Sequence, residues 1–408
     1  MNEPLSTDPY KGVRDFYPAD WARVQAMFSR MRETLEAWGY EEYNASPLER
    51  AELYEAKTSE EIVNEQTYTF TDRGDRRVTL RPEMTPTLAR MVAGKRRELA
   101  FPLRWFSIGN RFRYERPQRG RLREFYQTDV DLIGLPDGEA DIEIIRLASE
   151  ILKSFGATEK DFTIRVSSRA LLNAACEAAG LTGESSREYV RLLDKKSKMS
   201  AEEFKVASEA IFKTDPLSLI DAKPIEALIA TLKKRDVGNV VFDASITRGF
   251  DYYTDMVFEV FDTNPENPRA LFGGGRYDRL MALFGGDPIP AVGFAIGEVT
   301  LGDFLETHSL SLDTNAGKTQ LYVGTPTESD IPAAQAFADT VRKSGVRVFV
   351  NLSNRALGDQ IKDAVKRGIP NFAAYGADEV KNQTVRLKIL ATGEEKTLRV
   401  SELAHAIL

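Results

Sequence analysis

The hydrophobic pattern near the start of the chain predicts a helix over residues 20–38. Apolar side chains recur there every three or four positions, at Trp21, Val24, Phe28, Met31, Leu35 and Trp38. This spacing places them in one stripe, which an amphipathic helix buries against a core. Gly39 would end the helix, and residues 40–48 then have the pattern of a strand that is interrupted near Pro47.

A pattern with a period of two predicts a pair of strands around residues 105–113 and 124–132. One face of the first strand carries Trp105, Ser107, Gly109, Arg111 and Arg113. One face of the second carries Phe125, Gln127, Asp129 and Asp131. The joining residues 116–120 include the Pro and Gly of a turn together with two arginines. Unpaired ions are costly to bury, so we expect this polar sheet floor to hold a polyanion such as a nucleoside triphosphate.

Toward the C-terminus, the pattern alternates between strands and helices. Strands are predicted at 321–324, 347–350, 372–375 and 385–389, and helices at 331–344 and 356–367. This order indicates a small α/β domain with a mostly parallel sheet over residues 319–408. A polar linker is predicted at 307–318.

Residues 1–306 have a different organisation. Their strands are joined by turns rather than by helices, so we expect an α+β domain with an antiparallel sheet. Residues 168–236 have a helical and charged pattern.

Length and composition fit a globular protein of two or three domains. The chain has 408 residues, of which 42% are hydrophobic. It contains no run of eighteen apolar residues, and residues 1–15 lack the apolar stretch of a signal peptide. We therefore expect no membrane partner and a cytoplasmic location.

Scarce residue types exclude several kinds of chemistry. Cys176 is the only cysteine, which excludes an internal disulfide and a thiolate zinc site. His308 and His405 are the only histidines, too few for a His-rich metal site or a Ser-His-Asp triad. The sequence therefore identifies no set of metal ligands. The net charge of −7 is unlike that of a general nucleic-acid binder. From Lys318 onward, however, 13 basic side chains outnumber 10 acidic ones, so this part could face RNA.

Three motifs carry a family resemblance. Arg113-Tyr114-Glu115, followed after a loop by Arg121 and Arg123-Glu124-Phe125, resembles the second signature motif of class II aminoacyl-tRNA synthetases. Residues 247–254, TRGFDYYT, and 273–278, GGGRYD, resemble the histidine-pocket signatures of histidyl-tRNA synthetases, in that family's order and spacing.

The resemblance covers nearly the whole chain, and by position residues 168–236 match an insertion that members of this family carry in the catalytic domain. Residues 12–18 are similar to the family's opening segment, and residues 80–85 to its amino-acid-binding strand and turn. Residues 357–361 and 368–370 are similar to its anticodon-binding domain. The resemblance implies a histidine–tRNA ligase that uses L-histidine, ATP with Mg²⁺, and tRNA(His). The segment 20–48 looks like the first class II motif, which implies a homodimer, although an ordinary amphipathic helix explains it equally well.

The resemblance also assigns catalytic and nucleotide-binding roles. Adenylate formation brings a carboxylate against the α-phosphate of ATP, and cations placed where negative charge grows lower that barrier. Arg113 would hold the α-phosphate, and Arg248 would bridge the α-phosphate and the histidine carboxylate. Glu115 and Arg121 would contact the nucleotide.

A histidine ligand needs acceptors for its ammonium group and for its imidazole. The histidine-binding residues that the resemblance implies are Glu83, Thr85, Gln127, Asp131, Arg248, Tyr253 and Tyr277. Of these, Glu83, Thr85 and Gln127 fit the ammonium end, and Asp131 with Tyr253 fits the imidazole. Tyr252 is left out, because tyrosines on strands are more often structural.

One position departs from the family pattern. The third class II motif ends in Gly-x-Glu-Arg, and its arginine contacts the γ-phosphate of ATP. Here residues 290–297 match the motif, but Thr300 stands at the arginine position. Losing such a charge-assisted contact costs about 1.5–3 kcal/mol, unless Arg276, Arg279 or a second Mg²⁺ replaces it.

This departure leaves an alternative open. A catalytically weak synthetase relative could act as a regulatory subunit of ATP phosphoribosyltransferase in histidine biosynthesis, and Thr300 favours it. The retained Arg113, Arg121 and Arg248 and the complete C-terminal domain favour the ligase. An RNA-binding or stress-sensing module without ATP would leave those arginines unexplained.

Overall fold

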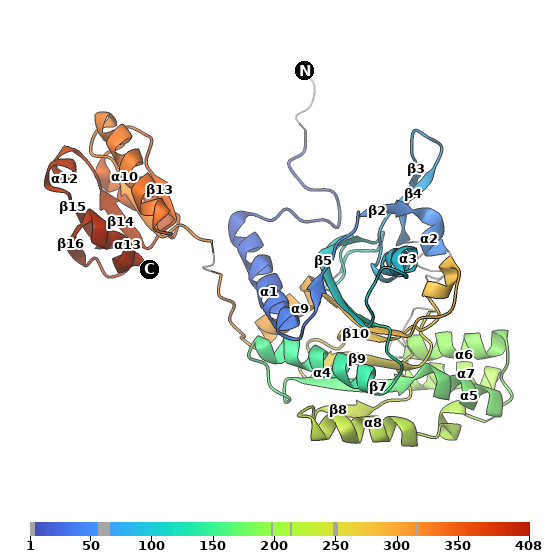
Figure 1. The fold of residues 1–408 in the computed structure, drawn as a ribbon. Helices are drawn as coiled ribbons and strands as arrows, with labels where there is room; N and C mark the ends of the chain where they lie inside the picture. Colours follow the sequence, from blue (N-terminus) through green and yellow to red (C-terminus); the bar gives the residue numbers. More distant parts are fainter. Residues whose placement is uncertain are drawn as a thin grey trace. The chain divides into compact units, whose positions relative to one another are not determined.

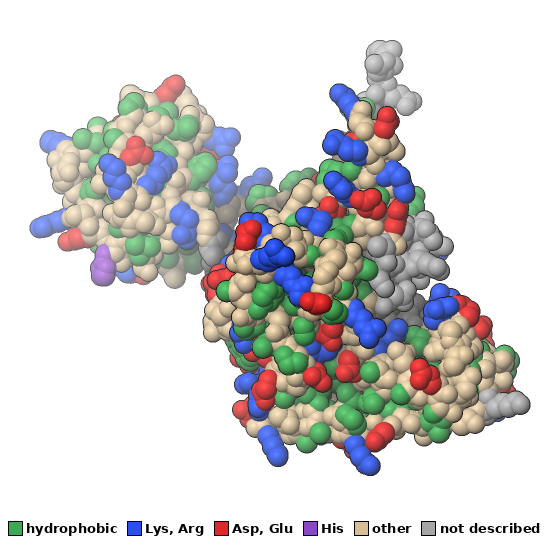
Figure 2. Space-filling view, turned by 45° about the vertical axis from the view of Figure 1, so that its right-hand side comes forward, with side chains coloured by type: hydrophobic (Ala, Val, Ile, Leu, Met, Phe, Trp, Pro, Cys, Tyr) green, Lys and Arg blue, Asp and Glu red, His purple; other side chains and the backbone are tan. Residues whose placement is uncertain are grey.

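The chain folds into two compact units that divide between Leu312 and Asp313. The computed structural model describes residues 5–55, 66–118, 120–196, 199–212, 214–247, 252–314 and 317–408. None of the helices among these residues has the length and apolar character that a membrane span requires. Basic and acidic side chains are interspersed over the face of each unit that Figure 2 shows.

The first unit is built around a large, mostly antiparallel sheet (Figure 1). Among the described residues it has eight strands, in the order β1 Glu41–Glu42, β5 Leu103–Phe112, β6 Glu124–Ile133, β11 Ala291–Gly297, β10 Ala270–Arg276, β9 Met256–Asp262, β7 Phe162–Ser168 and β8 Val240–Phe242. All pairings between β5 and β7 are antiparallel, and only the edge strands β1 and β8 pair in parallel. The predicted α+β class is confirmed.

Helices and a smaller sheet surround this framework. The small sheet has the described strands β2 Leu48–Arg50, β4 Arg77–Leu80 and β3 Tyr68–Thr71. The helices are α1 Pro18–Ala37, α2 Ala51–Glu55, α3 Thr85–Lys95, α4 Glu139–Ser154, α5 Arg169–Ala178, α6 Glu184–Lys195, α7 Ala201–Ile211, α8 Lys223–Lys234 and α9 Glu298–Thr307, with short 3₁₀ turns η3 Pro216–Leu219 and η4 Met281–Phe284. Helices α5 to α8 occupy the segment between β7 and β8.

The two faces of the large sheet differ because its strands alternate side chains. Phe106, Val130 and Phe294 point into the main core, where they are buried with apolar side chains of α1, α4 and α9. Helix α1 begins at Pro18, a favourable first helical position, and Gly39 follows it with a φ of +79°. The opposite face carries α3 and the polar side chains of the candidate site.

A buried ion pair joins β10 to α4. The Arg276 guanidinium donates to Asp141 Oδ1 at 2.7 and 3.0 Å and to Asp278 Oδ1 at 3.1 Å. It also donates to the carbonyls of Leu135 and Pro136 at 3.3 and 3.1 Å. Because these bonds engage its whole donor fork, Arg276 serves the scaffold and is not free to replace a missing phosphate contact.

The second unit has its own core and a mixed sheet. Its described strands are, in sheet order, β13 Val348–Val350, β12 Leu321–Gly324, β14 Asn371–Ala374, β15 Thr384–Ile389 and β16 Glu395–Arg399. Its helices are α10 Ile331–Lys343, α11 Leu357–Lys366, α12 Ala377–Asn382 and α13 Leu403–Ile407, with 3₁₀ turns η5 Glu328–Asp330 and η6 Val400–Glu402. The first three strands are parallel, as predicted. Strand β15 pairs antiparallel with β14, and β16 follows β15 in a short hairpin, which can join only antiparallel strands.

Candidate functional site

The site lies on the polar face of strands β5, β6 and β11. The sheet register places Trp105 and Gly293 on either side of Asp131, and Gly109 beside Gln127. A Cβ atom on Gly293 would lie 2.3 Å from Asp131 Oδ1, and one on Gly109 would lie 2.6 Å from Arg81 Nη2. Glycine at these positions therefore makes room for charged side chains on the sheet floor.

Part of the charge on this floor is neutralised by the protein itself. Arg111 is fully buried and donates to Asp129 Oδ2 at 2.5 Å and to Ser107 Oγ at 3.4 Å. The Gln127 amide donates to the other oxygen of Asp129 at 3.3 Å. Arg111 is therefore a scaffold cation, and the prediction of a polyanion rests on other arginines.

Asp131 forms one end of the site. The Tyr277 hydroxyl donates to its Oδ1 atom, whereas Oδ2 is buried and has no hydrogen-bond partner among the described residues. Burial, together with nearby Asp129, raises the pKa of Asp131 to about 8 against the opposing effects of the Tyr277 hydrogen bond and the Arg111 charge. A buried acceptor that lacks a partner is the feature expected where a ligand N–H binds.

Tyr43 belongs to the same end and was not predicted. Burial raises the pKa of its hydroxyl well above the ordinary value, and Asp131 and Asp129 add to this effect. Its backbone N–H donates to Phe106 O at 2.8 Å, and its ring lies 5.5 Å from that of Trp105. The 40–48 strand pattern placed Tyr43 in an element but gave no sign that this element reaches the floor of the sheet.

Glu83 forms the second acidic end. It is buried where β4 leads into α3, and the Tyr252 hydroxyl donates to its Oε2 atom at 2.9 Å. The Thr85 hydroxyl lies beside Tyr252. Burial and the negative charge of Glu83 raise the pKa of the Tyr252 hydroxyl well above its ordinary value. Tyr252, which the sequence interpretation left out, is thus a direct partner of a predicted site residue.

Three tyrosines connect the two acidic ends. The Tyr252 and Tyr277 ring centroids lie 5.9 Å apart, and those of Tyr252 and Tyr253 lie 4.9 Å apart. Tyr252 binds Glu83 and Tyr277 binds Asp131. The arrangement suits a small ligand that carries one hydrogen-bond donor toward each carboxylate.

Arg113 stands between the Glu83 end and the loop that joins β5 to β6. Its Nε donates to Pro82 O at 3.0 Å, and its guanidinium lies 5.3 Å from the Phe125 ring centroid. Burial lowers its pKa, although Glu115 and Glu83 act in the opposite direction. The two terminal nitrogens make no recorded hydrogen bond with the described residues, so they can serve an anion.

Within the loop, one arginine is exposed and another is structural. Arg121 donates to Glu115 Oε2 at 3.0 Å. Arg123 is buried, donates to Glu115 O and to the Tyr10 hydroxyl at 3.1 and 2.9 Å, and stacks 4.1 Å from the Tyr114 ring centroid. The structure thus brings the predicted Glu115 and Arg121 together, while Arg123 fastens the N-terminal segment to the loop.

The third-motif segment runs from β11 into α9. The Thr300 hydroxyl donates to Leu271 O at 2.7 Å and to Gly297 O at 3.1 Å. Glu298 is buried, accepts from Arg14, and accepts from the Tyr126 N–H at 3.3 Å. Burial raises the pKa of Glu298 against the opposing charge of Arg14.

One predicted site residue cannot be placed, and the described residues contain no ready-made metal cluster. Arg248, predicted as a catalytic and histidine-binding residue, lies outside the described residues. In the part of the chain that is described, no group of three or more His, Cys, Asp or Glu side chains could hold a metal ion.

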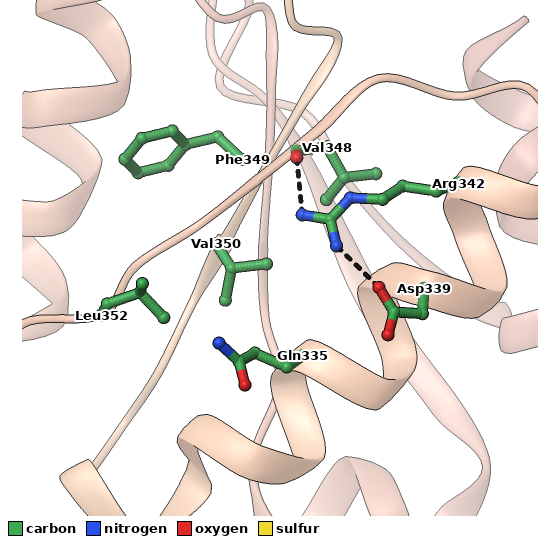
Figure 3. A pocket seen from close by; sticks show the side chains of 7 residues that line it. All are labelled: Gln335, Asp339, Arg342, Val348, Phe349, Val350 and Leu352. Atoms are coloured by element: carbon green, nitrogen blue, oxygen red, sulfur yellow. Dashed lines mark hydrogen bonds and ion pairs between the residues drawn. The ribbon is translucent and has the colours of Figure 1, made fainter.

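A separate cavity lies on the second unit. It has a volume of about 410 Å³ and is lined by Gln335, Asp339, Arg342, Val348, Phe349, Val350 and Leu352. Arg342 donates to Asp339 Oδ1 at 2.8 Å and to Val348 O at 3.0 Å, as Figure 3 shows. The cavity thus combines the side of α10 with the edge strand β13, and it offers both apolar and polar lining groups.

Comparisons with known proteins show the family to which the chain belongs. A family model described as histidyl-tRNA synthetase matches residues 12–222 and 198–300, and one described as an anticodon binding domain matches residues 320–408. The chain is 39% identical to the histidine–tRNA ligase of Leptospira biflexa over 429 aligned residues, covering 99% of this chain and 98% of that protein.

Solved structures show the same fold. The histidyl-tRNA synthetase from Nostoc sp. PCC 7120 superposes with a TM-score of 0.77 at 22% identity, over 98% of this chain and 99% of that one. A Bacillus halodurans protein described as an ATP phosphoribosyltransferase regulatory subunit/histidyl-tRNA synthetase has a TM-score of 0.68 at 25% identity, over 86% and 94% of the two chains.

The raised pKa of Asp131 predicts a pH-dependent contribution to stability. Between about pH 4, the pKa of an exposed Asp, and the folded value of about 8, the folded protein holds a proton that the unfolded chain has released. The free energy of unfolding should therefore fall as pH rises through this window and level off above it.

Asp131→Asn removes this pH-dependent contribution to stability. Denaturant titrations at pH 5 to 8.5 should show the variant gaining stability relative to the original protein as pH rises; a constant difference would contradict the assignment.

Proposed function

The chain belongs to the histidyl-tRNA synthetase family and is a histidine–tRNA ligase, and on this premise we propose which residues perform its chemistry. The enzyme activates L-histidine with ATP and transfers the product to tRNA. We place histidine between the Glu83 and Asp131 carboxylates and the nucleotide along the loop between β5 and β6. The observation that carries this proposal is the pair of tyrosine-linked carboxylates, one of which, Glu83, lies near Arg113.

The two carboxylates orient the amino acid. Glu83, with Thr85 and Gln127, would accept from the ammonium group, and Asp131 Oδ2 would accept from an imidazole N–H. Tyr277 holds Asp131 in place, Tyr252 does the same for Glu83, and Tyr253 packs beside Tyr252. Fixed acceptors at both ends lower the entropy cost of reaching the reactive pose.

The reaction joins the histidine carboxylate to the α-phosphate and releases pyrophosphate. Arg113 would stabilise the charge that develops on the α-phosphate, and Arg248 would bridge that phosphate and the carboxylate. Glu115 and Arg121, already paired at 3.0 Å, would contact the nucleotide. Burial strengthens the effect of Arg113, since charges interact more strongly away from water.

Mg²⁺ would accompany ATP and neutralise phosphate charge. It commonly binds through one or two carboxylates together with phosphate oxygens, so the lack of a larger cluster among the described residues is compatible with it. Glu124, at the base of the loop, accepts from the Asn110 amide at 3.1 Å and is the carboxylate we assign to it.

We predict that Arg113→Ala lowers histidine-dependent exchange of pyrophosphate into ATP by at least about a hundredfold, the scale of losing one strong electrostatic contact in the transition state. Both kcat and kcat/KM should fall, because the contact strengthens as charge develops. Arg187→Ala, in an exposed ion pair on α6, is the matched control. Near-normal exchange by the Arg113 variant would refute the assignment.

The regulatory alternative has weaker support. The Leptospira relative named as a ligase matches over 98% of its length, and the C-terminal unit matches an anticodon-binding model. Thr300 remains the feature that favours the alternative. The same exchange assay separates the two functions, since a regulator would not exchange pyrophosphate.

The C-terminal unit would bind the tRNA. The reaction would take place in the cytoplasm, where tRNA is charged. Deleting residues 313–408 should therefore preserve pyrophosphate exchange within about twofold, because the proposed site precedes the boundary. Transfer of histidine to tRNA should fall by at least about a hundredfold. Unchanged charging would rule out this role for the unit, whereas loss of exchange would show that the first unit depends on the second.

We also propose a homodimer that covers the small sheet. Leu48 and Phe70 are 45% and 48% exposed, and the register through β4 puts them on the same face of that sheet. Phe70→Asp should convert a dimer to a monomer in sedimentation velocity, because a buried charge opposes association. Thr69→Asp, on the opposite face, is the control. A monomeric original protein would contradict the proposal.

A further inference from the structure

An arginine that no motif singled out contacts the tip of the nucleotide loop. Arg269 is exposed, immediately precedes β10, and donates from Nη2 to Gln118 Oε1 at 3.2 Å. Gln118 lies directly opposite Arg121 in the loop, with reciprocal backbone hydrogen bonds of 3.0 and 2.9 Å. Arg269 therefore meets the same turn that presents Arg121.

Thr300 borders the same place from the other side. Its hydroxyl donates to Leu271 O, two residues beyond Arg269 in the chain. A Cβ atom built on Gly120, at the loop tip, would lie 3.8 Å from Thr300 Cγ2. The loop tip, Thr300 and the start of β10 thus adjoin one another, and Arg269 is the cation at that start.

Three of the neighbouring arginines are already balanced by carboxylates. Arg14 pairs with buried Glu298, Arg121 pairs with Glu115, and Arg276 pairs with Asp141. Arg269 makes no ion pair with any described residue, and its recorded contact is the neutral amide of Gln118. Its charge is therefore available to an anion.

We propose that Arg269 binds the terminal phosphates of ATP and so supplies the positive charge that Thr300 lacks. A guanidinium bonds to a phosphate about twice as strongly as to a neutral amide, so the bound nucleotide would replace Gln118 as its partner. With Arg113 at the base of the loop and Arg269 at its tip, a triphosphate meets cations at both ends. The inference rests on the proposed nucleotide site.

Three ligands separate this role from others: ATP, AMP and inorganic pyrophosphate. Arg269→Ala should weaken ATP binding with Mg²⁺ by roughly ten- to hundredfold, the range for one charge-assisted contact, and should change AMP binding less than about twofold. The KM for pyrophosphate in the reverse reaction should rise by a similar factor to the ATP effect. Arg269→Lys keeps the charge but not the planar fork. Its affinities for ATP and pyrophosphate should lie between those of the original protein and those of Arg269→Ala.

Arg187→Ala serves as the exposed control here as well. Equal losses for AMP and ATP would place Arg269 at the adenosine end and overturn the proposal, as would unchanged ATP or pyrophosphate affinity. If Arg113→Ala abolishes exchange while Arg269→Ala leaves the affinities unchanged, the nucleotide site stands and only the role of Arg269 fails. Normal exchange in the Arg113 variant would instead remove the site itself.

Discussion

The buried charge on one face of the large sheet is the constraint on which the rest of this structure depends. Strands β5 and β6 bury the side chains of Arg111, Asp129 and Asp131. Burying an unpaired ion costs several kcal/mol of folding free energy. Pairing offsets this cost for Arg111 and Asp129, and for Asp131 burial raises the pKa to about 8, so that this carboxyl holds a proton at neutral pH. Arg111 and Asp129 neutralise each other at 2.5 Å, whereas Asp131 keeps one oxygen without a partner among the described residues. In the proposed site, this oxygen would accept a hydrogen bond from the ligand.

The many arginines around the site therefore fall into two groups with different physical roles. Arg111, Arg123 and Arg276 donate to carboxylates, hydroxyls and carbonyls of the chain, and these bonds hold strands and segments together. Arg113 and Arg269 have recorded contacts that leave their charge uncompensated by an ion pair among the described residues. Substituting a member of the first group would damage folding, while substituting one of the second would damage ligand binding.

The loop between β5 and β6 connects these roles. Its base is fixed, because Arg123 joins it to Tyr10 and Tyr114. Its tip is exposed and meets Arg269 through the Gln118 amide. In the proposed site, a nucleotide would displace only the contact at the tip and leave the hydrogen bonds at the base in place. The replacement of an arginine by Thr300 then becomes a relocation of charge within one small region, on the interpretation proposed above.

The sequence by itself determined the local elements and the family. The three-to-four spacing from Trp21 to Trp38 predicted α1, and the two-residue alternation predicted β5 and β6, because these periods follow directly from backbone geometry. The motifs around Arg113 and Tyr277 indicated a histidyl-tRNA synthetase. Only the tertiary structure decided which charges are paired. Tyr252 with Glu83, Arg276 with Asp141 and Arg269 with Gln118 are separated by more than a hundred residues in the chain, and no periodicity reports such contacts. Their partners follow from how distant strands and loops pack, which sets the burial and charge balance of each group.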